Sequence, residues 1–485
     1  MQKIAVVGAG RIGTTIASML AHTGDYHVHV LDPHDQALAA LPKHAAIVPV
    51  QLTPQMEGTD LAALLAGSFA LLSAAPFHQM QRWAQAAVAV GAHYLDLTED
   101  IQSTQAIAAL SQQASTALIP QCGLAPGFVS IAAHHLCQAF DALDTVHLRV
   151  GALPRCADNS LGYQLSWSTE GVINEYSQPC EAKVEGQRQS LPALQGLERL
   201  RVLGQDYEAF NTSGGVGSLV QSLAGQVREL NYKTLRYPGH AERMRFLLDE
   251  LRLRDHRALL RQILEQALPA TEQDVVVIFI SVSGQQGGRL LQRHYAQEIY
   301  GTTLHGRAIS AIQSSTASSI CAVLDLLAQG QLPQSGWVRQ EAIALPLFLA
   351  NRFGAVYAPK VDCAHSADVA APAHFRSLQA LEGTPRRSTP FNIQNMPAPL
   401  PIFCKPWGWR CHRWRPQAPI YSSTAPLMAS AWHCCNAPRL RKRGSRWRKH
   451  NKPKRLGSTS PPPSAGRWCG CWVIWCASTR RHWPS

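Results

Sequence analysis

The sequence predicts an α/β protein with a doubly wound parallel sheet at its N-terminus, a following α+β domain and an irregular basic tail. Three observations predict this order. A glycine-rich turn separates the first apolar run from a helical pattern. Strand and helix patterns then alternate over roughly 120 residues, which is typical of a parallel sheet covered on both faces. After Gly127, longer strand patterns and turn-rich segments replace that alternation.

The first domain is expected to begin with a β-branched strand at residues 3–7 and a helix that carries Ile16 and Leu20 on one face. The expected strands after it are 28–31, 69–73, 93–97 and 117–120. Alanine-rich stretches around 61–65, 79–90 and 104–113 have the composition of the intervening helices.

The glycine turn reads Gly8-Ala-Gly10-Arg-Ile-Gly13, and the next expected strand ends at Asp32. A strand, this turn, a helix and then an acidic residue form the context that makes the motif specific for a dinucleotide, as in a Rossmann domain. Gly8 permits the tight turn, Gly10 lets the backbone approach a pyrophosphate, and Gly13 allows close helix packing. The helix N-terminus offers free N–H groups to the phosphates.

Asp32 is expected to accept hydrogen bonds from the ribose hydroxyls and to repel a 2′-phosphate, so NAD is favoured over NADP. Arg11 and His34 lie close enough in sequence to weaken this preference, and NADP stays possible. The other residues predicted to contact the cofactor are Ile12, the turn Ala74-Ala75-Pro76 at the carboxyl side of the sheet, and Gly123.

The second domain is expected to contain strands at 145–153, 163–168 and 274–282, a long helix over 241–268, and a helical stretch over 315–329. We place the boundaries at 1–122 for the Rossmann domain, 123–312 for the α+β domain, 313–358 for helices that return to the Rossmann domain, and 359–485 for the tail.

The basic character of the chain is concentrated in the tail. Residues 364–485 hold 20 of the 45 Lys and Arg but only 2 of the 32 acidic residues. Runs such as Arg439-Leu-Arg-Lys-Arg443 and Arg446-Trp-Arg-Lys449 mix cations with aromatics, which is one pattern of nucleic-acid binding. A frameshifted or read-through C-terminus explains the same abrupt change of composition without any function, and this interpretation is favoured.

Other composition signals point to a reduced, non-membrane protein. The six cysteines before residue 364 are scattered, with no Cys-x-x-Cys pair, so neither a disulfide framework nor a metal site is predicted. Polar residues or glycine interrupt every hydrophobic stretch, so no membrane span is expected, and the N-terminus is a poor signal peptide. We expect a cytoplasmic protein.

Several blocks of residues 1–358 together resemble the saccharopine dehydrogenase family, and within it the lysine 6-dehydrogenase-like members. They are VVGAGRIG at 6–13, DLTED at 96–100, GLAPG at 123–127, WSTEG at 167–171, FNTSGG at 210–215, NYKTLRYPGH at 231–240 and RQE at 339–341. The resemblance implies a nicotinamide-dependent oxidation of an amine-bearing carbon, or reduction of the imine, on a lysine-like amino acid. It also implies a homodimer, in which the 123–312 domain binds substrate and forms the dimer contact. Saccharopine-reducing members carry Asp where this chain has Ala125. A simpler amino acid such as lysine is therefore favoured over saccharopine as the substrate.

Such a reaction needs a base that keeps the amine neutral or activates water. Glu99 and Asp100 follow a strand end near the cofactor and are the first candidates, although acids at a helix N-terminus also stabilise its dipole. Glu170 is a third candidate, which could meet a substrate ammonium, form an ion pair or cap a helix.

A zwitterionic substrate also needs a carboxylate clamp. Arg236 is the preferred candidate because a guanidinium offers a bidentate fork, and the family places a similar Arg-Tyr pair, here Arg236-Tyr237, at the substrate. Lys233 and His240 could add charge or proton transfer, or could be an exposed flank. The alternative to an enzyme is a Rossmann protein that senses NAD without catalysis.

Overall fold

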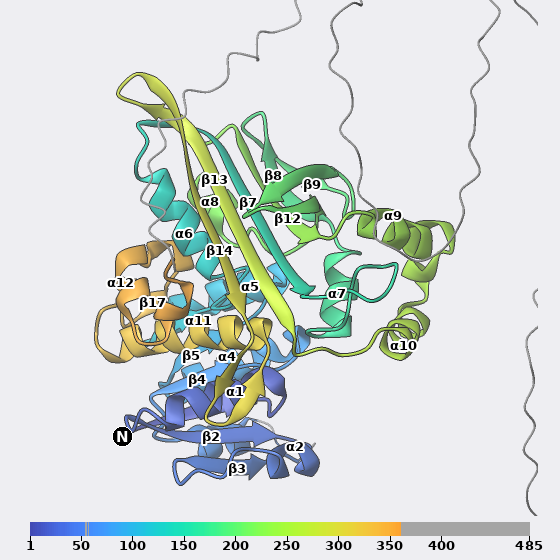
Figure 1. Ribbon diagram of the computed structural model, residues 1–485. Helices are drawn as coiled ribbons and strands as arrows, with labels where there is room; N and C mark the ends of the chain where they lie inside the picture. Colours follow the sequence, from blue (N-terminus) through green and yellow to red (C-terminus); the bar gives the residue numbers. More distant parts are fainter. Residues whose placement is uncertain (54–55, 57, 360–485) are drawn as a thin grey trace, which may run out of the picture. The chain divides into compact units, whose positions relative to one another are not determined.

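The computed structural model describes residues 1–53, 56 and 58–359 (Figure 1). The described residues belong to one compact unit. Apart from Pro359, the tail on which a nucleic-acid contact was predicted lies outside the described residues.

The first sheet is parallel throughout and runs in the order β17-β6-β5-β4-β1-β2-β3. Alternate residues of β1 pack into two different apolar cores: Ile4 and Val6 join the core under α1, whereas Ala5 and Val7 join the core under α3 and α4. The sheet is therefore covered on both faces, and the predicted α/β class is confirmed. The strands are β1 (Gln2–Val7), β2 (Tyr26–Asp32), β3 (Ile47–Gln51), β4 (Ala70–Ser73), β5 (His93–Asp96), β6 (Ala117–Ile119) and β17 (Gly336–Trp337). The helices along this part of the chain are α1 (Arg11–Ala21), α2 (Asp35–Ala39), α3 (Thr59–Leu65), α4 (Met80–Ala89), α5 (Ile101–Leu110) and α6 (Phe128–Cys137).

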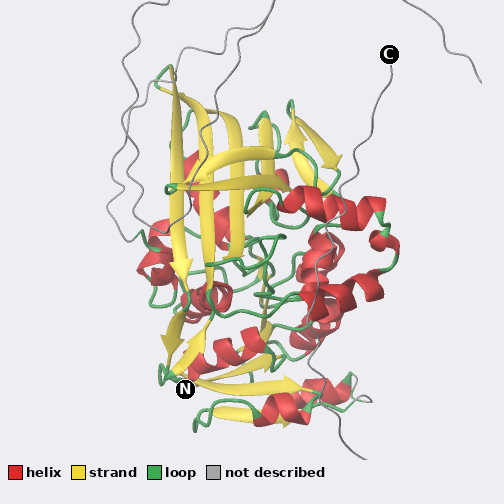
Figure 2. Ribbon diagram, turned by 45° about the vertical axis from the view of Figure 1, so that its right-hand side comes forward, coloured by secondary structure: helices red, strands yellow, loops and turns green. Residues whose placement is uncertain are grey.

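The second sheet is mixed and has eight strands, in the order β10-β11-β12-β7-β13-β14, with β8 and β9 attached at β12 (Figure 2). Its central pair, β12 and β7, is parallel, and the other pairs are antiparallel. The strands are β7 (Ala142–Pro154), β8 (Cys180–Val184), β9 (Gln187–Leu191), β10 (Glu198–Val202), β11 (Gln205–Asn211), β12 (Glu229–Arg236), β13 (Asp274–Gln286) and β14 (Arg289–Tyr300). A two-stranded hairpin, β15 (Thr302–Leu304) and β16 (Arg307–Ile309), follows them.

After this hairpin the chain returns to the first sheet. Helix α11 (Ala311–Ala328) packs on α1, and β17 pairs with β6. The start of α11 is fixed by a capping box, in which Ser310 and Gln313 exchange hydrogen bonds, and by the buried Asp274 carboxylate, which accepts from the first backbone N–H groups. By length and hydropathy α11 could cross a membrane, but 83% of it is buried inside the protein, as expected for a core helix.

Two predicted elements are wrong. Residues 163–168 form no strand, because Tyr163 is buried against a neighbouring helix layer and only Leu165 makes an isolated bridge, to Ala270. The single helix expected over 241–268 is broken at Arg252, which has a left-handed φ of 56°. The break changes the phase of the helix, so that the side chains on both sides of it reach one core. The pieces are α9 (His240–Arg245), a π-helical turn η3 (Phe246–Glu250), η4 (Leu253–Asp255) and α10 (Arg257–Ala267).

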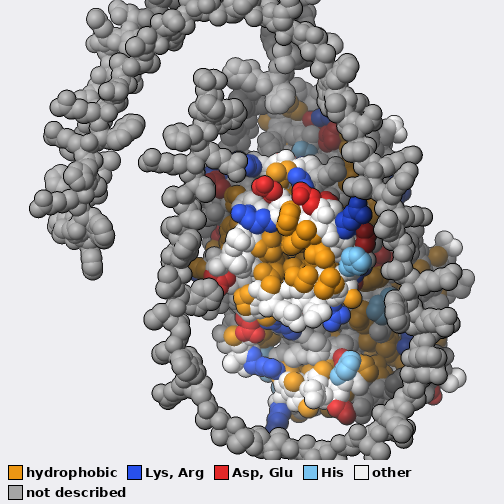
Figure 3. All heavy atoms as spheres, turned by 90° about the vertical axis from the view of Figure 1, so that its right-hand side faces the viewer, with side chains coloured by type: hydrophobic (Ala, Val, Ile, Leu, Met, Phe, Trp, Pro, Cys, Tyr) orange, Lys and Arg blue, Asp and Glu red, His pale blue; other side chains and the backbone are white. Residues whose placement is uncertain are grey.

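The outer side of these pieces carries an apolar surface. Phe246, Leu251, Leu259 and Ile263 are between 36% and 51% exposed. Figure 3, which views the side where α9 and α10 lie, shows a group of hydrophobic side chains bordered by charged ones. Apolar patches of this kind are characteristic of contact surfaces.

The last described turn is predicted to set the limit for truncation. Tyr357 is buried, stacks on Phe128 with 3.9 Å between ring centroids, and donates a hydrogen bond of 2.7 Å to the Ser315 carbonyl. A chain that ends at Ala358 should keep its unfolding free energy and bind polyanions less in a salt-sensitive way, since the basic residues are removed. A chain that ends at Val356 should lose about 3–5 kcal/mol of unfolding free energy, measured by urea denaturation. This is the usual cost of removing a buried aromatic side chain. Equal stability of the two truncated chains would contradict this.

Candidate functional site

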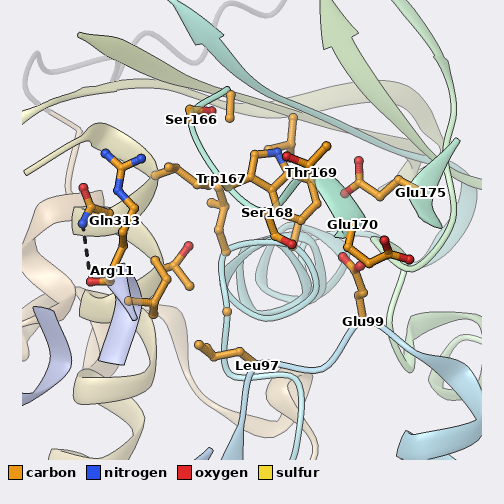
Figure 4. A pocket seen from close by; sticks show the side chains of 18 of the residues that line it. Arg11, Leu97, Glu99, Ser166, Trp167, Ser168, Thr169, Glu170, Glu175 and Gln313 are labelled. Atoms are coloured by element: carbon orange, nitrogen blue, oxygen red, sulfur yellow. Dashed lines mark hydrogen bonds between the residues drawn. The ribbon is translucent and has the colours of Figure 1, made fainter. Parts of the chain in front are cut away.

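A cavity of about 680 Å³ lies between the carboxyl ends of the first sheet and the face of the second sheet. In open α/β sheets, ligands bind at these strand ends. Its wall runs from the glycine turn through the loops after β4, β5 and β6 to α7 (Thr169–Glu175), β12 and α10. Figure 4 shows Arg11 and Gln313 on one side of this space and three glutamates on the other. One cavity thus joins the predicted cofactor and substrate regions.

The glycine turn has the geometry that a dinucleotide requires. Gly8 adopts a φ of +99°. A Cβ on Gly13 would lie 1.8 Å from the Gly8 carbonyl oxygen, so only glycine allows α1 to pack this close. Gly10 caps α1 without a side chain and would meet nothing within 4 Å if it had a Cβ, so the helix N-terminus faces open space. These residues fit a pyrophosphate.

Asp32 ends β2 beside this turn. Its Oδ2 accepts a hydrogen bond of 2.7 Å from the Ala9 N–H, and its Oδ1 accepts one of 2.8 Å from the His34 N–H. Although burial opposes the charge, these bonds and the His34 ring hold the pKa of Asp32 below its ordinary value. The carboxylate is ionised and fixed, but it does not line the cavity itself.

The other predicted cofactor residues divide into two groups. Arg11, Ile12, Ala74 and Gly123 line the cavity, and the Ala74 carbonyl lies 3.0 Å from the position of a Gly8 Cβ. Ala75 and Pro76 continue the loop after β4 and do not line it. The Arg11 guanidinium lies 3.4 Å from the Glu272 carboxylate at the surface.

Arg236, at the end of β12, places a buried cation on the cavity wall. It is 2% exposed; its Nε donates to the Tyr176 hydroxyl at 2.9 Å, and its guanidinium lies 4.9 Å from the centre of the Tyr163 ring. Burial opposes the charge, but the two tyrosines and Glu175 raise the pKa of Arg236 above its ordinary value. The site therefore offers a permanent positive charge.

His240 lies behind Arg236 and not on the wall. Its Nε2 is 3.0 Å from the Tyr176 hydroxyl, and its Nδ1 is 2.9 Å from the Leu161 carbonyl. Burial and Arg236 lower the pKa of His240 to about 3, so the ring is neutral. The carbonyl can only accept, so Nδ1 carries the proton and Nε2 accepts from Tyr176. His240 thus orients the tyrosine that holds Arg236, which corrects its predicted substrate contact.

Lys233 and Tyr237 are not brought to the cavity, a second correction. Side chains of a strand alternate between the two faces, and Tyr232, Thr234 and Arg236 face the cavity. The Lys233 ammonium instead lies 2.8 Å from the Glu198 carboxylate, and the Tyr237 hydroxyl donates to the Pro154 carbonyl.

Two carboxyl groups, Glu99 after β5 and Glu175 at the end of α7, share the cavity wall, and Figure 4 shows both on the same side. Burial, and then the nearby Glu175 and Asp100, raise the pKa of Glu99 well above its ordinary value. Burial raises the pKa of Glu175 to about 7, while Arg236 acts to lower it. Such a pair holds a proton near neutral pH and can exchange it with a bound amine.

Glu175 is not among the residues predicted from the sequence. Its one signal is a carboxylate two residues after the apolar pair Val172-Ile173, in a helix whose buried residues include Glu175 itself. The other two predicted acids have structural partners. Asp100 caps α5 by accepting from the Ser103 N–H at 2.7 Å, and the exposed Glu170 pairs with Arg257 at 2.7 Å on the cavity rim.

Two family profiles match the chain: the saccharopine dehydrogenase NADP-binding domain over residues 4–119 and the saccharopine dehydrogenase C-terminal domain over 123–351. Solved structures with a similar fold include apo saccharopine dehydrogenase (L-Glu forming) from Saccharomyces cerevisiae, with a TM-score of 0.58, 15% identity, and 72% of this chain and 95% of that chain covered. Another is homospermidine synthase from Legionella pneumophila in complex with NAD, with a TM-score of 0.54, 14% identity, and 74% and 90% covered.

Proposed function

Because the chain belongs to the saccharopine dehydrogenase family and is an NAD(P)-dependent oxidoreductase, we propose that it oxidises the amine-bearing carbon of a lysine-like amino acid. The observation that carries the proposal is the cavity wall that combines the glycine turn, the buried Arg236 and the Glu99–Glu175 pair. The glycine turn fits a dinucleotide, Arg236 fits a substrate carboxylate, and the Glu99–Glu175 pair fits a substrate amine.

The reaction divides among these residues as follows. Arg236 binds the substrate carboxylate, and the hydrogen bond from its Nε to the Tyr176 hydroxyl fixes the position of the guanidinium. The Glu99–Glu175 pair takes a proton from the substrate ammonium, because only the neutral amine can stabilise the developing imine. A bound nicotinamide supplies the hydride acceptor. After that proton passes to solvent, the same carboxyl pair takes a proton from the water that hydrolyses the imine and returns it to the departing nitrogen.

The test is a screen of amino acids and diamines with NAD or NADP, following the absorbance of the reduced cofactor. We expect the strongest rate with lysine or a similar diamino acid. Purified protein that binds NADH but reduces no cofactor with any amine would contradict the proposal and favour a protein that senses NAD.

We further propose that Asp32 selects NAD. A fixed carboxylate at the end of β2 accepts from ribose hydroxyls and repels a 2′-phosphate. Asp32→Ala should therefore lower kcat/KM for NAD by about 10- to 100-fold and change the value for NADP much less. Asp35→Ala, an exposed acid in the first turn of α2, is the matched control. A wild type that prefers NADP, or an unchanged preference in Asp32→Ala, would contradict the assignment.

A further inference from the structure

A second cavity, about 500 Å³, meets the first at Glu99, which lines both. It lies between the turn that starts α5, the loop after α7, the β8–β9 hairpin and Gly214. A Cβ on Gly214 would lie 2.9 Å from the Glu99 Cβ, so the backbone here packs directly on that side chain. Helix α7 contributes Glu175 to the first cavity and its neighbour Asn174 to the second.

The second cavity contains buried polar groups that have no partner in the described part of the chain. Asn174 and Ser213 are only 8% and 7% exposed, line the cavity, and make no side-chain hydrogen bond to a described residue. The polar atoms of both side chains are open to the cavity and are not sealed in the packed interior. Their oxygen atoms can accept hydrogen bonds from a ligand.

The charge of the second cavity is negative. Three carboxylates line it, and its one cation, Arg188, pairs with one of them, Glu181. Of the other two, Glu99 shares a proton with Glu175, so Asp100 supplies the remaining negative charge. A small ligand with several N–H donors and a positive charge matches these groups.

We propose that the second cavity is the route by which the released nitrogen, as ammonium or a short primary ammonium ion, leaves the site. The inference rests on the proposed function. Oxidation gives R–CH=NH₂⁺ from R–CH₂–NH₃⁺ with transfer of a hydride to the cofactor and loss of one proton. Water then adds to the iminium carbon, and the C–N bond breaks to give R–CHO and NH₄⁺. The ammonium passes Glu99 to Asn174 and Ser213, so the carbonyl product and the cofactor need not leave first.

The test blocks the second cavity without touching the first. Ser190 lies on β9, is exposed and lines the second cavity, whereas Gln187 lies on the same strand, is also exposed and does not line the cavity. In the direction that consumes ammonium, carbonyl substrate and reduced cofactor, Ser190→Trp should raise KM for ammonium by about tenfold or more. KM for the reduced cofactor should stay unchanged, and Gln187→Trp should behave as the wild type.

Two outcomes separate this inference from the proposed function. If the wild type turns over an amine but Ser190→Trp and Gln187→Trp have the same ammonium KM, the route is wrong while the function stands. If no amine is oxidised, methylammonium binding to the full chain, followed by NMR titration, still tests the site. Binding that Ser190→Trp abolishes and Gln187→Trp retains would support it, and equal binding in both variants would overturn it.

Discussion

Arg236→Ala is expected to lower kcat/KM for the amino acid by about 30- to 1,000-fold, equivalent to about 2–4 kcal/mol of transition-state stabilisation. The guanidinium is the buried cation on the substrate side of the cavity, and its loss leaves a substrate carboxylate without a partner. Arg236→Lys keeps the charge but loses the planar fork, so its loss should be smaller. NAD affinity should barely change, because the glycine turn holds the pyrophosphate.

The control for Arg236 is its strand neighbour Lys233, which faces the opposite side and pairs with Glu198. Lys233→Ala should leave kcat/KM close to that of the wild type. Circular dichroism and NADH binding check that each variant is folded. Normal amino-acid kinetics in Arg236→Ala would eliminate the clamp, and equal loss of NADH binding would point to a role in packing.

Glu175→Gln is expected to lower kcat by about 100- to 10,000-fold, the usual contribution of a general base. In the wild type, kcat should rise as pH increases through about 7, where the Glu175 carboxyl loses its proton. The variant should lack this limb, because an amide does not titrate. Glu170→Gln, which changes only the rim pair with Arg257, should keep the wild-type pH profile. If kcat of Glu175→Gln still rises with pH through about 7, the titrating group is a residue other than Glu175.

The same substitution has an opposite expected effect on stability. The pKa of Glu175 is raised from 4.5 in the unfolded chain to about 7 in the folded one. The folded chain favours the protonated carboxyl. The stability that depends on this protonated form is therefore complete below pH 4.5 and is lost as pH rises through 7. Above pH 8 the buried charge costs up to about 3 kcal/mol, so Glu175→Gln should unfold at higher urea there and change little at pH 4.

The first sheet could be predicted because its signals are local. The glycine turn is dictated by contacts within a few residues, such as the close approach of Gly13 to Gly8. Strand alternation also shows, once Arg236 faces the cavity, that Lys233 must face away.

Other parts of the site depend on packing that no local pattern reports. The raised pKa of Glu175 arises from its burial beside Glu99, which lies in another domain of the sequence. Likewise, no glycine in the sequence marks the helix break at Arg252, and the helical spacing of leucines continues on both sides of the break. In both cases the deciding contacts form only after distant segments meet.

The late return of the chain to its first sheet has a consequence for how the protein folds. Strand β17 pairs with β6, and α11 covers α1, although more than half of the described chain lies between these partners. During synthesis, the N-terminal segment therefore emerges with one sheet edge unpaired and part of its apolar face uncovered until α11 and β17 follow. We expect the two sheets to unfold in a single cooperative transition, and amide exchange in β6 to be as slow as in the centre of β13.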